Sequence, residues 1–182
     1  MERIAAFQTR AQRISSLAFS PDGTILAAGY DDGVAEAWSL TLRRRVILVA
    51  GHKESVRAVA VTPDGKTLLT ASYDATAKLW DLESGREKAT LGGQLLAYYS
   101  AAISQDGRRL ILGGADGTVQ LFDLASANEV ARLTTDGTGI DAVGFLPDGN
   151  TLIGLSESAK LWRWRTASTA GIGTTKRSNS NE

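Results

Sequence analysis

The chain has 182 residues, of which 43% are hydrophobic and 22% charged, as in soluble globular proteins that bury a core. Its twenty basic residues balance twenty acidic ones, so we expect no attraction to nucleic acid or to an anionic membrane surface. The absence of cysteine excludes disulfides, thiolate catalysis and cysteine-based metal sites. No apolar stretch has the length of a signal peptide or of a membrane span, and we therefore expect a cytoplasmic protein.

A repeat of 42 residues organises the chain. It is most visible at turn triplets of the Pro-Asp-Gly type, whose glycines are Gly23, Gly65, Gly107 and Gly149. The aromatic residues Trp38, Trp80 and Phe122 follow the same step. Agreement between several residue classes in one register predicts tandem structural units.

The first predicted element is a short strand at residues 3–7. Val49, Leu91 and Leu133 each lie in the last strand of a repeat, and a step of 42 residues back from Val49 leads to Phe7. We therefore expect residues 3–7 to be a fourth strand that has no first, second or third strand before it.

The first full repeat is expected near residues 13–49 and the second near residues 55–91. In the second, residues 56–61 are β-branched or small and apolar, and a Pro-Asp-Gly turn follows, in which proline presets φ and glycine accepts a positive φ. Further short strands are predicted at residues 67–72, 77–80 and 87–91. Four short strands separated by turns predict one antiparallel sheet, and no segment shows a helical period.

The third repeat is expected near residues 97–133 and the fourth near residues 139–165. In the fourth, Trp164 lies at the 42-residue step, but residues 159–162 repeat residues 77–80 letter for letter. We interpret this as a two-residue deletion that puts Trp162 in the place of Trp80 and Trp164 in the place of Leu82. Residues 166–182 are rich in Ser, Thr, Gly and Asn, and we predict that this tail is disordered.

The chain resembles the Trp-Asp (WD) repeat family of β-propellers. The second repeat carries the resemblance best, with Gly51-His52, Pro63-Asp64-Gly65 and Leu79-Trp80-Asp81. The third repeat keeps Leu121-Phe122-Asp123. The resemblance covers residues 3 to about 165 and implies an all-β fold, a β-propeller of four-stranded antiparallel blades within residues 1–165.

The number and phase of the repeats leave the closure of this propeller open. Propellers have about 4–8 blades, and a ring that stays open exposes unpaired sheet edges. A fourth strand at the start and three strands at the end suit closure, because the N-terminal strand can complete the last blade. Three arrangements are compatible with this phase: four blades that close alone, a homodimer that closes an eight-bladed ring, and a partial propeller from a larger WD-repeat protein.

The resemblance also implies a structural hydrogen-bond relay within a blade, formed by His52, Ser72, Asp74 and Trp80. His52 is the only histidine of the chain, so only the second repeat can hold the full relay. A nucleophilic Ser-His-Asp triad is the other interpretation of these residues, and we reject it because no oxyanion or nucleophile-elbow motif accompanies them.

The resemblance implies, finally, a partner-binding face formed by the loops at one end of the blades. The residues expected there are Arg13, Asp31, Arg57, Tyr73, Tyr99 and Asp141. Tyrosine and arginine are enriched among the residues that dominate protein interfaces. We predict a non-catalytic interaction scaffold that binds other proteins or peptides, without metal or cofactor. A propeller-based hydrolase-like enzyme is the alternative, and a single histidine with aspartates confined to repeated turns argues against it.

Overall fold

The computed structural model describes residues 9–92 and 96–165. The strand expected at residues 3–7 and the tail expected to be disordered at residues 166–182 lie outside the described residues. Within the described ranges the chain forms fifteen β-strands, and none of these residues builds a helix that could cross a membrane.

The strands form four antiparallel sheets that follow the repeats. The first sheet is β1 (Ile14–Phe19), β2 (Ile25–Tyr30), β3 (Val34–Ser39) and β4 (Arg44–Ala50). The second sheet is β5 (Val56–Val61), β6 (Thr67–Ser72), β7 (Thr76–Asp81) and β8 (Glu87–Gly92). The third sheet is β9 (Tyr98–Ile103), β10 (Arg109–Gly114), β11 (Thr118–Asp123) and β12 (Glu129–Thr134). The fourth sheet has three described strands, β13 (Ile140–Phe145), β14 (Thr151–Ser156) and β15 (Leu161–Arg165).

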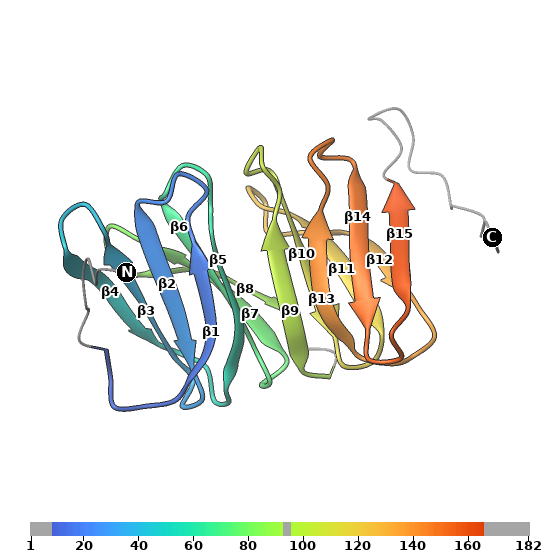
Figure 1. Cartoon of the computed structure of the whole chain (residues 1–182), viewed down its shortest axis with the longest axis horizontal. Coiled ribbons are helices and arrows are strands. Elements are labelled where there is room, and N and C mark those ends of the chain that lie inside the picture. The colour runs from blue at the N-terminus through green and yellow to red at the C-terminus, as the bar shows by residue number, and fades with distance from the viewer. Residues whose placement is uncertain (1–8, 93–95, 166–182) are drawn as a thin grey trace, which may run out of the picture.

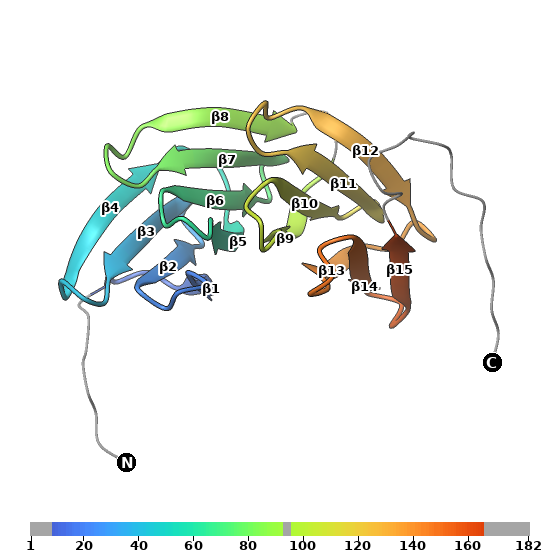
Figure 2. The same ribbon diagram turned by 90° about the horizontal axis from the view of Figure 1, so that it is seen from above.

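The four sheets stand side by side around an arc (Figure 1). Seen from above, β1, β5, β9 and β13 lie innermost, while β4, β8 and β12 form the outer rim (Figure 2). The arc is open, because the described strands of the first and fourth sheets do not pair with each other. The fold is thus the expected array of propeller blades.

Local chemistry explains why each sheet turns where it does. In the second sheet, Asp64 accepts hydrogen bonds from the hydroxyl of Thr62 (2.6 Å) and the backbone N–H of Lys66 (3.0 Å), and Gly65 has a φ of 66°. A carboxylate that bonds the backbone two residues on, followed by a residue that tolerates positive φ, is typical of a tight turn. The equivalent turn in each repeat therefore joins the first and second strands.

The core consists of side chains trapped between neighbouring sheets. Val59 and Val61 of the second sheet pack against Ala27 and Ala37 of the first. The second and third sheets meet through a cluster that includes Leu69, Leu79, Leu110 and Phe122. The third and fourth sheets meet through a cluster that includes Ile111, Leu121, Ile140 and Leu152. Each sheet consequently has one face for the preceding sheet and one for the following sheet.

The fourth sheet corrects one interpretation of the sequence. Leu152 pairs with Trp164, as Leu68 pairs with Trp80 in the second sheet. Trp164 is therefore the equivalent of Trp80, and no two-residue deletion exists, because Leu155 pairs with Leu161 as Ala71 pairs with Ala77. Trp162 takes the register of Lys78 and stacks on Trp164 with ring centroids 6.2 Å apart.

Candidate protein-binding face

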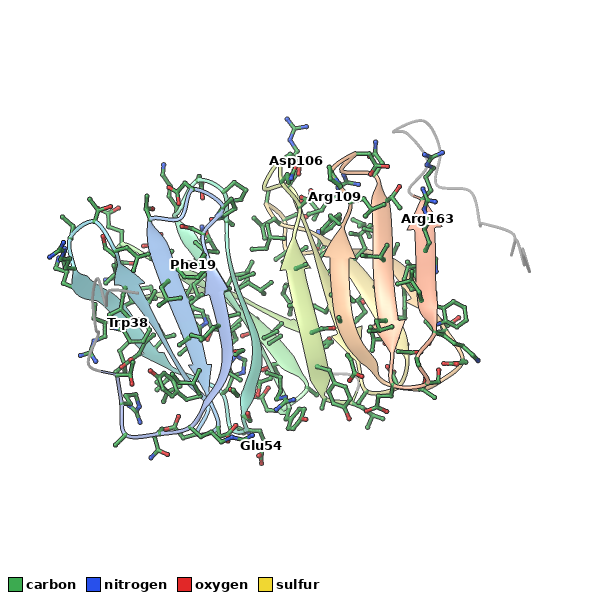
Figure 3. All side chains as sticks on the ribbon, viewed as in Figure 1. Phe19, Trp38, Glu54, Asp106, Arg109 and Arg163 are labelled. Atoms are coloured by element: carbon green, nitrogen blue, oxygen red, sulfur yellow. The ribbon has the colours of Figure 1, made fainter. Side chains whose placement is uncertain are left out.

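Two positions in each repeat lie at the same edge of the sheets, where the first strand begins and the second strand ends. One is the second residue of the innermost strand, which is Ser15, Arg57, Tyr99 or Asp141. The other follows the second strand and is Asp31, Tyr73, Ala115 or Glu157. In Figure 3, Glu54, which precedes β5, lies at this lower edge of the sheets, and Asp106 lies at the opposite, upper edge. The repeat thus presents a row of side chains whose chemistry changes from sheet to sheet.

Arg57, Tyr73 and Tyr99 form the centre of this row, and we call them the aromatic–arginine cluster. The guanidinium of Arg57 lies 4.8 Å from the centroid of the Tyr73 ring. The Tyr73 and Tyr99 rings are tilted by 59° with centroids 5.5 Å apart, a geometry typical of favourable aromatic pairs. Tyr73 is 40% exposed, and the buried Nε of Arg57 has no hydrogen-bond partner in the described structure.

Arg13 and Asp31 lie at the first sheet and are already engaged with each other. The guanidinium of Arg13 is 3.3 Å from the carboxylate of Asp31, which also accepts a hydrogen bond from the hydroxyl of Ser55 at 2.9 Å. Arg13 is largely exposed, so this ion pair contributes little to stability. These two predicted residues therefore flank the aromatic–arginine cluster and do not belong to it.

Asp141 lies on the far side of Tyr99, together with Glu157, which sequence reasoning missed. A Cβ on Gly139 would contact both the Tyr99 ring, at 2.7 Å from Cε2, and Glu157, at 3.0 Å from Cδ, and Asp141 lines the same hollow as Tyr99. Burial and, after it, these two carboxylates raise the pKa of the Tyr99 hydroxyl. Both side chains are exposed, and neither forms an ion pair with a described residue. Glu157 could have been found, because it stands 84 residues, or two repeats, after Tyr73.

The face opens into a shallow hollow on the inside of the arc. The hollow has a volume of about 310 Å³, and its lining includes Arg57, Tyr99 and Asp141 at the face and Leu17, Val59 and Val143 deeper in. All of these residues come from β1, β5, β9 and β13. The structure thus brings three of the six predicted residues to the mouth of one hollow.

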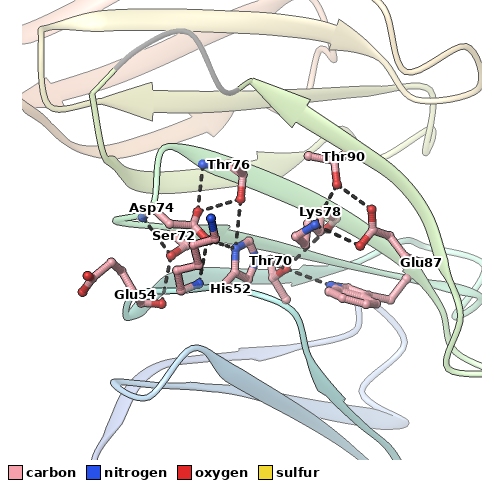
Figure 4. A network of polar contacts seen from close by, with 11 residues as sticks. His52, Glu54, Thr70, Ser72, Asp74, Thr76, Lys78, Glu87 and Thr90 are labelled. Carbon is pink, nitrogen blue, oxygen red and sulfur yellow. Dashed lines mark hydrogen bonds and ion pairs between the residues drawn. The ribbon is translucent and has the colours of Figure 1, made fainter.

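Near this edge of the second sheet, His52, Asp74, Thr70 and Trp80 form a hydrogen-bond relay (Figure 4). Asp74 lies 3.0 Å from Nδ1 of His52, and Nε2 of His52 lies 2.7 Å from the hydroxyl of Thr70. The indole N–H of Trp80 donates to the same hydroxyl at 2.9 Å. A neutral His52 that donates from Nδ1 to Asp74 and accepts at Nε2 satisfies every group.

Thr70, and not Ser72, is the hydroxyl of this relay, which corrects the sequence assignment. The Ser72 hydroxyl donates to the backbone oxygen of Glu54 (3.0 Å) and accepts from the backbone N–H of Asp74 (3.1 Å). Thr70 and Ser72 point to the same side of β6, and only Thr70 lies far enough along it to reach both His52 and Trp80. Ser72 therefore holds the loop before β5 and not the ring of His52.

The relay is a closed structural unit. The side chain of His52 is only 1% exposed, and burial lowers its pKa although the neighbouring Asp74 carboxylate opposes this. Burial would raise the pKa of Asp74, but hydrogen bonds from Thr76 and from the backbone N–H of Lys53 hold it below its usual value. A buried neutral histidine with both ring nitrogens occupied cannot reach a substrate.

The first and third sheets replace the relay by tyrosines. Tyr30 donates to Glu36 at 2.9 Å, and burial together with Glu36 raises the pKa of Tyr30 to about 12. Tyr98 donates to Gln120 at 2.6 Å, and burial raises its pKa to about 12. In both sheets the buried tyrosine hydroxyl thus has a hydrogen-bond partner within its own sheet. Among residues 9–92 and 96–165 no cluster of three acidic or histidine side chains could hold a metal ion.

Comparison with protein families matched the chain in three places. The family model described as "WD domain, G-beta repeat" matches residues 2–39, 43–81 and 85–123, which is more than half of the chain. The three matches end with β3, β7 and β11, and the second and third begin just before β4 and β8. The comparison with curated proteins found no match.

Proposed function

Because the chain belongs to the WD-repeat family, whose repeats are generally protein-interaction modules and typically not catalytic, we propose that it is a non-catalytic scaffold that binds a protein segment at the candidate face. The observation that carries this proposal is the aromatic–arginine cluster of Arg57, Tyr73 and Tyr99. Tyr73 is exposed, Arg57 and Tyr99 are half-buried at the mouth of the hollow, and no other repeat has the same combination of side chains.

The charges around the cluster suggest which partner residue it takes. Asp141 and Glu157 place two exposed carboxylates, without ion-pair partners in the described chain, beside the ring of Tyr99. A lysine or arginine of the partner would find there both opposite charge and an aromatic face, and cation–π contacts of this kind contribute about 0.5–2 kcal/mol. We therefore propose that the bound segment carries a basic side chain.

The test is selection of binding peptides from a random displayed library on the immobilised protein. We expect enrichment of peptides that contain a lysine or arginine. The affinity for the selected peptide should fall at least tenfold in two variants: Tyr99→Ala, which removes the aromatic face, and the double variant Asp141→Asn with Glu157→Gln, which removes the charge. Fluorescence anisotropy of the labelled peptide measures each affinity.

The matched control variants are Lys66→Ala and Arg108→Ala. They change exposed turn residues at the opposite edge of the second and third sheets and should leave the affinity unchanged. Equal losses in the control and face variants, or peptides that bind the face variants as tightly as the unchanged protein, would refute this site.

A further inference from the structure

Within residues 9–92 and 96–165, two apolar sheet faces of the open arc have no neighbouring sheet. No described sheet packs before the first sheet, and its Leu17 and Phe19 are 60% and 63% exposed, whereas the equivalent Val59 and Val61 are 6% and 4% exposed. No described sheet packs after the fourth sheet, and its Leu161 is 72% exposed where the equivalent Ala77 is fully buried. Phe19 and Arg163 mark these two faces in Figure 3. Covering these side chains would be favourable, because it removes apolar surface from water.

Every interface inside the arc joins the two kinds of face in the same way. In each case, a small residue near the end of the second strand packs against the first residue of the innermost strand of the next sheet. A Cβ on Gly29 would lie 2.6 Å from Cγ1 of Val56, and one on Gly113 would lie 2.8 Å from Cγ2 of Ile140. Between the second and third sheets, Ala71 shares its cluster with Tyr98.

At the two ends of the arc, the residues at these positions are Leu155 and Ile14. They are 42% and 38% exposed, and nothing in the described chain covers them as the inner sheets cover their equivalents. Leu155 is larger than the Gly29, Ala71 and Gly113 that occupy its position inside the arc, so a contact that brings it against Ile14 must be wider at this point than the internal contacts. Beside them, Ile153 of the fourth sheet would meet Leu17 and Phe19 as Ile111 meets Val143 and Phe145.

Arg163 is the one charged residue placed on this apolar pattern. It stands at the position of Leu79 and Leu121, which are buried between sheets. The aliphatic stem of an arginine can lie on apolar side chains while its guanidinium reaches water at the rim. Arginine in place of leucine at this position is therefore compatible with a covered face, and it makes the interface at the fourth sheet more polar than the interfaces inside the arc.

We propose that a second copy of this chain covers both end faces, so that two arcs close head to tail into one eight-bladed ring. One chain offers one face of each kind, and two chains satisfy all four faces at once through two identical contacts. The end sheets lie on opposite sides of the opening of the arc, as closure by a twofold axis requires (Figure 2). A different protein would have to match both faces separately.

The experiment is the mass of the full chain by light scattering after size-exclusion chromatography at micromolar concentration. We expect the mass of two chains. The variants Ile14→Asp and Leu155→Lys should each fall to the mass of one chain, because each places its charge in both contacts of the ring. Circular dichroism of each variant reports whether the sheets remain folded.

Mixing the two variants supplies a decisive second measurement. A ring made of one copy of each has one unaltered contact and one contact in which the aspartate introduced at position 14 faces the lysine introduced at position 155, so the mixture should return to the mass of two chains. Leu48→Asp and Val130→Lys alter residues that are 41% and 40% exposed on the outermost strands, and both should keep the mass of two chains.

Three results would overturn the proposal. The unaltered chain could have the mass of one chain, its mass could rise without limit as the concentration rises, or Leu48→Asp could dissociate it as completely as Ile14→Asp does. The first result means that the faces stay uncovered or belong to another protein, and the second means that the contact forms an open fibre.

Discussion

At the scale of the residue, His52 shows how burial turns an ionisable group into a structural one. The tautomer that satisfies all partners donates from Nδ1 to Asp74 and accepts at Nε2 from Thr70, and this tautomer belongs to the neutral ring. Protonation would convert Nε2 into a second donor facing a hydroxyl that already accepts from Trp80. Protonation of His52 would therefore destabilise the second sheet.

This effect predicts a pH dependence of stability. Because burial holds the pKa of folded His52 below the usual 6.5, the unfolded chain binds a proton near that pH before the folded chain does. The free energy of unfolding should fall as the pH drops from 7.5 to 5.5, and level off below the folded pKa. Urea unfolding of the wild type and His52→Gln measures it.

The variant is the control, because the carboxylates of the chain titrate mainly at lower pH and remain in both proteins. His52→Gln should be less stable at pH 7.5 but nearly flat between the two pH values. An equal slope in the two proteins would assign the pH dependence to groups other than His52.

At the scale of the element, strand bounds follow from sequence more readily than side-chain partners do. The four strands expected in the second repeat agree with β5 to β8 within two residues, because turn chemistry and alternating apolar residues mark their ends. The assignment of Ser72 failed because Thr70 lies on the same side of β6, and only the packed sheet shows which hydroxyl meets His52. The assignment of Trp162 as the equivalent of Trp80 was wrong because it relied on the identity of residues 159–162 with residues 77–80, whereas the strand pairing places Trp164 opposite Leu152.

Sheet packing makes a further prediction at this scale. Gly113 lies in β10 where its missing side chain admits Ile140, and a Cβ there would also meet the hydroxyl of Ser100. Since that hydroxyl donates to the backbone oxygen of Ile140 at 2.8 Å, Gly113→Ala should force the third and fourth sheets apart. We expect a loss of about 1–3 kcal/mol in the free energy of unfolding, the usual cost of overpacking.

Gly144 offers the matched substitution, because it also lies in a strand but a Cβ there would approach no described atom closer than 3.6 Å. Gly144→Ala should change the free energy of unfolding by less than about 1 kcal/mol. A Gly113→Ala protein as stable as the Gly144→Ala protein would mean that the two sheets can separate without loss.

At the scale of the whole molecule, the arc behaves as a one-dimensional array. The clusters of the core join only neighbouring sheets, so each sheet depends on the one before it and the one after it. The second and third sheets have a neighbour on both faces, whereas the described parts of the first and fourth have one. Stability should therefore be highest in the middle of the chain and lowest at the two ends.

Amide hydrogen exchange of the Ile14→Asp variant tests this gradient in the single chain. The strands β2, β6, β10 and β14 each pair with a strand on both sides, so they differ mainly in how many sheets cover them. We expect β2 and β14 to exchange at least tenfold faster than β6 and β10, because exchange reports the free energy of local opening. Equal protection in all four strands would show that the array opens as one cooperative unit, and that a covering sheet adds nothing to the stability of its neighbour.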